Sequence, residues 1–183
     1  KHDLPVPAAN DGASGTAVLL DLARRFGNRP PPVPVVLAFF DGEDFGGPGR
    51  GEDYCVGSEH AAAAVVRGEI PWHSGRPAAV VVLDMVGERG AEFPRRPDAL
   101  DGPGRALADA LWGTAKRLGV RSFSDRLGVG IQDDHTAFLQ LGIPAALVID
   151  YEYGGPRNPW WHSTEDTPEK CDAAALEGVG RVL

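Results

Sequence analysis

The sequence predicts a three-layer α/β/α fold, in which helices cover both faces of a twisted central sheet that is mainly parallel, or mixed. Three continuous apolar runs, at residues 35–40, 79–83 and 145–149, are typical of strands buried on both faces. Stretches with apolar residues at helical spacing lie between and after these runs. The chain has 183 residues and neither a repeat nor a linker, so residues 1–183 are expected to form a single domain.

Helices are expected wherever apolar residues recur at helical spacing, at residues 14–26, 58–67, 104–118, 134–141 and from 173 onwards. Gly27 stands where a C-cap is typical, and Ser58 and Asp172 stand where N-caps are typical. The Pro-rich stretch 30–34 and the Gly-rich stretch 46–51 are expected to be loops.

The ends of the chain indicate that it is partial. It begins at Lys1 without a basic and apolar leader, and its last helical pattern stops at Leu183. We therefore expect the domain to lack its N-terminal strands and the end of its last helix.

Composition and charge exclude several classes of function. The net charge of -8 argues against a nucleic-acid-binding protein, because phosphate contacts require clustered Lys and Arg. No apolar run approaches the roughly 18 residues of a membrane span. No Gly-rich phosphate loop follows a strand, and the acidic segment 41–44 lacks the spacing of an EF-hand. Cys55 and Cys171 form neither a disulfide framework nor a metal-ligand motif.

Acidic residues follow each of the three predicted strands. The first strand runs into segment 41–44, the second ends in Asp84 and the third in Asp150. In open α/β sheets, ligands bind beyond the carboxyl ends of the strands, where these side chains would meet. Carboxylates gathered there repel one another unless a cation or shared protons offset their charge. Each one alone is as readily a helix cap or a turn residue, but the group as a whole indicates a site at which a cation or shared protons offset the charge.

Three further segments are candidates for the same crevice. Two glycines in segment 10–15 allow a tight turn, so Asp11 can point into the crevice, unless it serves as a helix N-cap. His162 follows two tryptophans in a loop after the third strand, where a metal ion can reach it; the alternative is an ordinary surface or core histidine. In segment 133–135, one aspartate is expected to cap the following helix and the other to face the site.

Six segments, in the same order along the chain, resemble the superfamily of zinc aminopeptidases and glutaminyl-peptide cyclotransferases, peptidase family twenty-eight. They read NDGASGTAVLLDLA, VLAFFDGEDFG, GSEHAA, VVLDMVG, DDHTAFLQLGIPA and WWHSTEDTPEK, and cover roughly residues 9–170. DGE followed by an acid, DDH before a helix and Trp directly before His are most similar to the glutaminyl cyclase branch and its bacterial relatives. The resemblance implies a zinc exopeptidase-like fold and a zinc metalloenzyme.

The resemblance also implies roles for single residues. It makes Asp11, Asp44 and His162 the ligands of a zinc ion, and these three leave a fourth position open for water or substrate. It makes Glu43 the general base or acid, held close to the metal by the adjacent ligand.

Three more residues are assigned in the same way. Asp84 matches a strand-end aspartate that binds a second metal in the aminopeptidases or joins a hydrogen-bond network in the cyclases. Asp134 matches the acidic partner of that network, and Trp161 matches a wall of the substrate pocket. The upstream His-x-Asp motif that completes a second zinc site in the aminopeptidases is absent here, so we expect one zinc ion, or two if that motif precedes Lys1. His60, His73 and His135 match no catalytic position and are expected to be surface or structural residues.

The resemblance implies an enzyme that acts on the N-termini of peptides or proteins. A glutaminyl-peptide cyclotransferase, which is an acyltransferase, would cyclise an N-terminal glutamine and release ammonia. An aminopeptidase, which is a metallopeptidase and hydrolase, would hydrolyse the first peptide bond; the DDH and WWH segments favour the cyclotransferase. The alternative from another class is a non-catalytic binding protein on the same scaffold, against which the retention of Glu43, Asp11 and His162 argues. An exported enzyme, periplasmic or extracellular, is expected from the resemblance alone, and the oligomeric state stays open.

Overall fold

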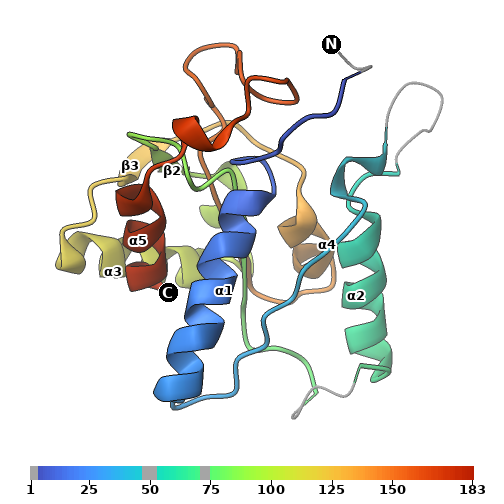
Figure 1. The fold of residues 1–183 in the computed structure, drawn as a ribbon. Helices are drawn as coiled ribbons and strands as arrows, with labels where there is room; N and C mark the ends of the chain where they lie inside the picture. The colour runs from blue at the N-terminus through green and yellow to red at the C-terminus, as the bar shows by residue number, and fades with distance from the viewer. Residues whose placement is uncertain (1–3, 47–52, 71–74) are drawn as a thin grey trace.

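The computed structural model describes residues 4–46, 53–70 and 75–183 (Figure 1). Its helices are α1 (Ala13–Asn28), α2 (Val56–Arg67), α3 (Arg105–Leu118), α4 (Asp134–Gln140) and α5 (Ala173–Val182). Its strands are β1 (Val80–Asp84), β2 (Phe93–Arg95), β3 (Phe123–Leu127) and β4 (Ala145–Ile149). Short 3₁₀ turns occupy Glu43–Phe45, Pro97–Ala99 and Pro168–Lys170.

The strands pair in parallel. β1 and β4 are hydrogen-bonded in the register that places Val80 opposite Ala145 and Asp84 opposite Ile149. β2 and β3 form a second parallel pair, with a register shift after Pro94. Parallel pairing brings the carboxyl ends of β1 and β4 to the same edge, which is where the sequence predicts a site.

Helices cover β4 on both faces. All five of its residues are buried, which explains why its sequence is continuously apolar rather than alternating. Ala146 and Val148 pack in a core shared with α1, α3 and α5, whereas Ala145 packs against α2 and α4 (Figure 1). This arrangement confirms the predicted three-layer α/β/α fold.

Two of the three predicted helix caps are wrong. α1 continues through Gly27 to Asn28, because Gly27 does not adopt the left-handed conformation with which glycine ends a helix. α2 begins two residues before Ser58, whose hydroxyl donates to the carbonyl oxygen of Cys55 at 3.0 Å. The cap at Asp172 is confirmed, since its side chain accepts a hydrogen bond from the backbone N–H of Ala174.

The predicted strand at 35–40 is also wrong. The segment has no regular secondary structure, because no strand lies beside it among the described residues and a strand requires a paired backbone. Its apolar side chains Val35, Val36 and Phe39 are exposed. Phe40 alone reaches the core, where its ring centroid lies 6.0 Å from that of Phe138.

β2 and β3 are absent from the sequence prediction. β2 has only three residues, and proline or polar residues interrupt in both strands the apolar pattern by which a strand is recognised. The predicted loop at 46–51 and His73 lie largely or wholly outside the described residues. Within the described ranges, no helix is long and apolar enough to cross a membrane.

Candidate metal centre

Three side chains from distant parts of the sequence converge beyond β1. Asp11 lies in the turn before α1, Asp44 in the 3₁₀ turn Glu43–Phe45 and His162 in the loop after β4. Nε2 of His162 lies 2.9 Å from Oδ2 of Asp44 and 3.3 Å from Oδ2 of Asp11. One ligand atom of each residue lies within 4.8 Å of the other two, and no other such trio of potential ligands occurs in the described part of the chain.

The turn that carries Asp11 is fixed to the segment after β1. The buried side chain of Asn10 accepts a hydrogen bond from the backbone N–H of Gly87 at 2.7 Å. The hydroxyl of Ser14 donates to the carbonyl oxygen of Asn10 and accepts from the backbone N–H of Val86. Because these groups are buried, Asp11 cannot shift without leaving polar atoms unpaired.

The electrostatics of the three residues fit a cation. Hydrogen bonds to Asp11 and Asp44 raise the pKa of His162 to about 10, and the bond to His162 lowers the pKa of Asp44. In the metal-free protein, a proton on the imidazole therefore holds the two carboxylates together. A zinc ion can take the place of that proton, since two carboxylates and an imidazole are ordinary zinc ligands and leave a fourth position open.

Trp161 covers one side of the centre. Its ring stacks on the imidazole of His162, with a centroid distance of 3.8 Å and an interplanar angle of 25°. It also lines a cavity of about 300 Å³ together with Tyr151, whose ring centroid lies 6.4 Å away. This position suits the pocket wall that the sequence predicts.

Glu43 precedes the candidate ligand Asp44 and is half-buried. Burial and the carboxylates of Asp44 and Asp133 raise the pKa of Glu43 to about 8. The backbone N–H of Cys55 donates to the carbonyl oxygen of Glu43 at 2.9 Å, and the Cys55 thiol lies 4.0 Å from Oε1. A carboxyl group with a pKa near neutrality can both accept and return a proton, as the predicted acid or base must.

Asp84 and Asp133 bring further acidic groups to the centre. Burial and the nearby carboxylates of Asp133 and Asp11 raise the pKa of Asp84 well above its ordinary value. Burial raises the pKa of Asp133 to about 6, although the charge of His135 opposes the rise. Burial and mutual repulsion therefore favour the protonated forms of these acids, and a nearby cation would oppose this effect.

The structure therefore brings Asp133, rather than Asp134, beside Asp84. Asp133 caps α4 in a capping box with Thr136 and also faces the acidic cluster, which combines the two roles that the sequence assigns to separate residues. Asp134 is buried, and a hydrogen bond from Ser58 of α2 counters the rise of its pKa. A capping aspartate uses one carboxylate oxygen for the helix, so its second oxygen is free to face another group. That free oxygen is the signal by which the second role of Asp133 could have been predicted.

The remaining candidates lie apart from the three converging residues. Asp150 accepts a hydrogen bond from the backbone N–H of Glu92 and lines the cavity beyond Trp161. His60 is exposed and His135 is buried against Asp98, as expected of surface and structural histidines. Both cysteines are free.

Comparisons with known proteins agree with this geometry. The family model described as Peptidase family M28 matches residues 2–183. The chain is 29% identical over 184 residues to Aminopeptidase YwaD of Bacillus subtilis, covering 97% of this chain and 36% of that protein. It is 27% identical over 207 residues to glutaminyl-peptide cyclotransferase of Bos taurus, covering 96% of this chain and 54% of that protein.

Solved structures give the same picture. The crystal structure of Tannerella forsythia glutaminyl cyclase matches 97% of this chain with a TM-score of 0.84 and 30% identity, and the match covers 62% of that chain. The present chain thus spans only part of the length of these relatives. Since the family model matches nearly the whole sequence and the candidate ligands converge, the chain belongs to peptidase family M28.

Proposed function

We propose that this chain carries the catalytic centre of a zinc-dependent enzyme that cyclises N-terminal glutamine of peptides and releases ammonia. The observation that carries the proposal is the position of Glu43, a proton carrier with a pKa of about 8, next to the converging ligands Asp11, Asp44 and His162. Similarity to glutaminyl-peptide cyclotransferases supports the choice of reaction.

Asp11, Asp44 and His162 would hold a single zinc ion. When bound, zinc acts as a Lewis acid that polarises the carbonyl of the side-chain amide. These three residues form one group of potential ligands, enough for one ion. The pKa of Asp84 is raised by burial and by the neighbouring carboxylates, which suits a member of a hydrogen-bond network beside the zinc ion.

Glu43 moves the proton during cyclisation. The α-amine of the substrate attacks the carbon of its own side-chain amide, and the carboxylate of Glu43 takes a proton from the attacking nitrogen. The bond from that carbon to the amide nitrogen then breaks, and Glu43 returns the proton to the departing ammonia. Asp84 and Asp133 lie in the acidic cluster that includes Glu43, and Trp161 would wall the pocket in which the substrate side chain lies.

The test uses the full-length protein with zinc and two peptides, one that begins with Gln and one that begins with Leu. Mass spectrometry follows the products. Loss of ammonia from the Gln peptide, with the rest of its chain intact, is the expected result. Unchanged peptides in the presence of bound zinc would overturn the proposed reaction.

Aminopeptidase activity is the second candidate, and the similarity to Aminopeptidase YwaD favours it. In that reaction Glu43 would take a proton from the water that attacks the first peptide bond. Release of a free first residue from either peptide would establish this reaction. If neither peptide changes and zinc causes no thermal stabilisation, the non-catalytic binding protein becomes the better interpretation.

A further inference from the structure

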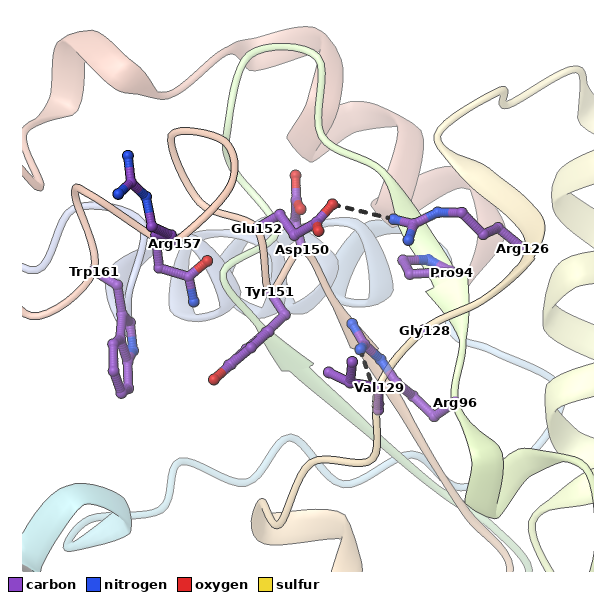
Figure 2. A pocket seen from close by; sticks show the side chains of 11 residues that line it. Pro94, Arg96, Arg126, Gly128, Val129, Asp150, Tyr151, Glu152, Arg157 and Trp161 are labelled. Atoms are coloured by element: carbon purple, nitrogen blue, oxygen red, sulfur yellow. Dashed lines mark hydrogen bonds and ion pairs between the residues drawn. The ribbon is translucent and has the colours of Figure 1, made fainter.

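A cavity of about 300 Å³ lies directly beyond Trp161 (Figure 2). Trp161 separates it from the metal centre, because one ring lines the cavity and also stacks on the imidazole of His162. When the first residue of a peptide lies at the metal centre, only the side chain of Trp161 therefore separates it from this cavity. Its apolar walls come from Pro94, Val129, Tyr151 and Trp161.

Of the two acidic groups that line the cavity, Glu152 has an ion-pair partner, whereas Asp150 has a neutral hydrogen-bond donor. The side chain of Arg126 forms ion pairs with Glu92 at 3.1 Å and with Glu152 at 3.4 Å. The carboxylate of Asp150 accepts a hydrogen bond from the backbone N–H of Glu92 at 3.0 Å. In Figure 2, Glu152 reaches towards Arg126, away from Trp161.

A buried positive charge lies at the wall of the cavity. Arg96 is only 2% exposed, and its guanidinium donates to the carbonyl oxygens of Val129 at 3.2 Å and Ile149 at 2.9 Å. Its Nε has no hydrogen-bond partner within the described residues. Carbonyl oxygens satisfy donors without cancelling the charge, so Arg96 contributes a positive potential to the cavity, which the nearby carboxylate of Asp150 partly offsets.

Arg157 lies at the opposite end, above Trp161 (Figure 2). Its side chain has no hydrogen bond or ion pair with any residue that the structure describes. Its backbone has a φ of 78°, and that of Asn158 has a φ of 49°, a conformation that costs non-glycine residues about 1 kcal/mol or more each. The loop is held in this form by backbone hydrogen bonds, among them that from the N–H of Trp161 to the carbonyl oxygen of Asn158 at 3.2 Å.

We propose that this cavity binds a carboxylate of the peptide substrate, beyond its first residue, against Arg157. The proposal rests on the proposed function, because it takes the N-terminus of a peptide to lie at the metal centre. The carboxylate belongs to an acidic side chain at the second or third position, or to the chain terminus of a short peptide. A lysine in the same place would meet the charge of Arg157, so the pocket discriminates against basic residues.

The test measures kcat/KM of the full-length zinc enzyme on three C-terminally amidated peptides. They begin with Gln and carry Glu, Gln or Lys at the second position; a parallel set carries the same residues at the third. An exposed ion pair is worth up to about 1 kcal/mol, so we expect a preference of about fivefold for Glu over Gln. Lys should be poorer than Gln, and added salt should weaken both differences.

Variants assign the preference to its residue. Arg157→Gln should abolish it and Arg157→Glu should reverse it in favour of Lys. Arg29→Gln, an exposed arginine after α1, serves as the matched control and should leave the preference unchanged. Equal kcat/KM values for the three residues at both positions in the wild type, or a preference that survives Arg157→Gln, would overturn an acidic side chain as the ligand.

Free-acid versions of the neutral peptides test the other source of the carboxylate. In one outcome, the free-acid peptides are preferred over their amides while Glu at the second or third position gives no advantage. If Arg157→Gln then removes the preference for the free acid, the ligand is the chain terminus. If neither set shows an Arg157-dependent preference, the pocket has no role in binding a carboxylate.

Equilibrium binding separates this inference from the proposed reaction. The same peptides are titrated into the zinc-loaded Glu43→Gln variant, in which the proton carrier is removed. An Arg157-dependent preference for the acidic peptide in binding, without turnover by the wild type, would uphold the pocket and reject the cyclisation. Turnover by the wild type without any preference in rate or binding would uphold the cyclisation and reject the pocket.

Discussion

The buried carboxylate of Asp166 accepts a hydrogen bond at 3.0 Å from the backbone N–H of Asp11, which lies 155 positions earlier in the sequence. The same carboxylate accepts from the backbone N–H of Asn10 at 2.8 Å and from the hydroxyl of Tyr153 at 2.6 Å. Asp166 lies in the same loop as His162. One side chain therefore fixes two candidate zinc ligands relative to each other.

Replacement of Asp166 by Asn should weaken zinc binding about tenfold or more, because residues that orient metal ligands contribute to affinity at this scale. The side chain of Asn has an NH₂ group in place of one carboxylate oxygen, and this group would face a hydrogen-bond donor. We therefore also expect a loss of about 2 kcal/mol in the free energy of unfolding without zinc. Tyr153→Phe, which removes one of the three donors, should have a smaller effect on both. Chelator competition measures the zinc affinity and thermal unfolding measures the stability. Asp125→Asn, at an exposed position, is the control. Unchanged zinc affinity in Asp166→Asn would leave Asp166 a purely structural role.

Substitution of Glu43 by Gln should lower turnover at least a hundredfold while leaving zinc bound, because an amide of the same shape cannot accept a proton. Asp44→Asn, one position later, is the matched comparison and should lose zinc as well as activity. Steady-state kinetics and metal analysis on the same samples measure the two effects. Activity that persists in Glu43→Gln would remove this residue from proton transfer.

Two apolar runs of similar sequence adopt different structures. The run 145–149 becomes β4, with every residue buried, whereas the run 35–40 has exposed valines and no strand beside it among the described residues. Continuous apolarity shows that a segment is suited to burial on both faces. Whether a neighbouring strand exists to pair with it is a property of the rest of the sheet, which the run itself does not encode.

The candidate site was predicted in outline from the sequence. Asp11, Asp44 and His162 were named from a resemblance, and the structure brings them together. The sequence leaves open which of the two aspartates in segment 133–135 caps the helix, and the resemblance assigns the site role to Asp134, whereas Asp133 combines both tasks. Its second task depends on which residues surround it in three dimensions, and those come from β1 and from the turn before α1.

Zinc binding should release at least one proton at pH 7. The pKa of His162 is raised to about 10 in the metal-free protein, so its imidazole is protonated at neutral pH and must lose that proton to bind zinc. Affinity should therefore rise about tenfold per pH unit from pH 7 until the pH approaches that pKa. Calorimetric titrations in buffers of different ionisation enthalpy count the protons. His162→Ala should bind zinc more weakly and with a shallower pH dependence; an unchanged affinity would exclude it as a ligand.

Asp133 and Asp134 should differ in their effect on turnover. Asp133→Asn preserves the helix cap, since Asn caps as well as Asp, but removes an acid beside Asp84 and should slow turnover about tenfold or more. Asp134 interacts with Ser58 instead, so the turnover of Asp134→Asn should stay within a few-fold of that of the wild type. Both variants should retain zinc. Kinetics together with melting temperatures test this, and a larger loss in Asp134→Asn would return the role to the residue that the sequence indicated.

Gly15→Ala should destabilise the protein and disturb the metal centre. A Cβ at this position would overlap the carbonyl oxygen of Leu83, so α1 must move away from β1, and Asp11 lies in the turn that begins this helix. Overpacking of this kind costs about 1 to 3 kcal/mol in the free energy of unfolding. Gly27→Ala, in the same helix, meets no atom within 4 Å and should instead stabilise by about 0.5 to 1 kcal/mol, through helix propensity. Denaturant unfolding of both variants, with zinc affinity measured in parallel, checks the contrast; a neutral Gly15→Ala would mean that the close contact between α1 and β1 does not fix the position of Asp11.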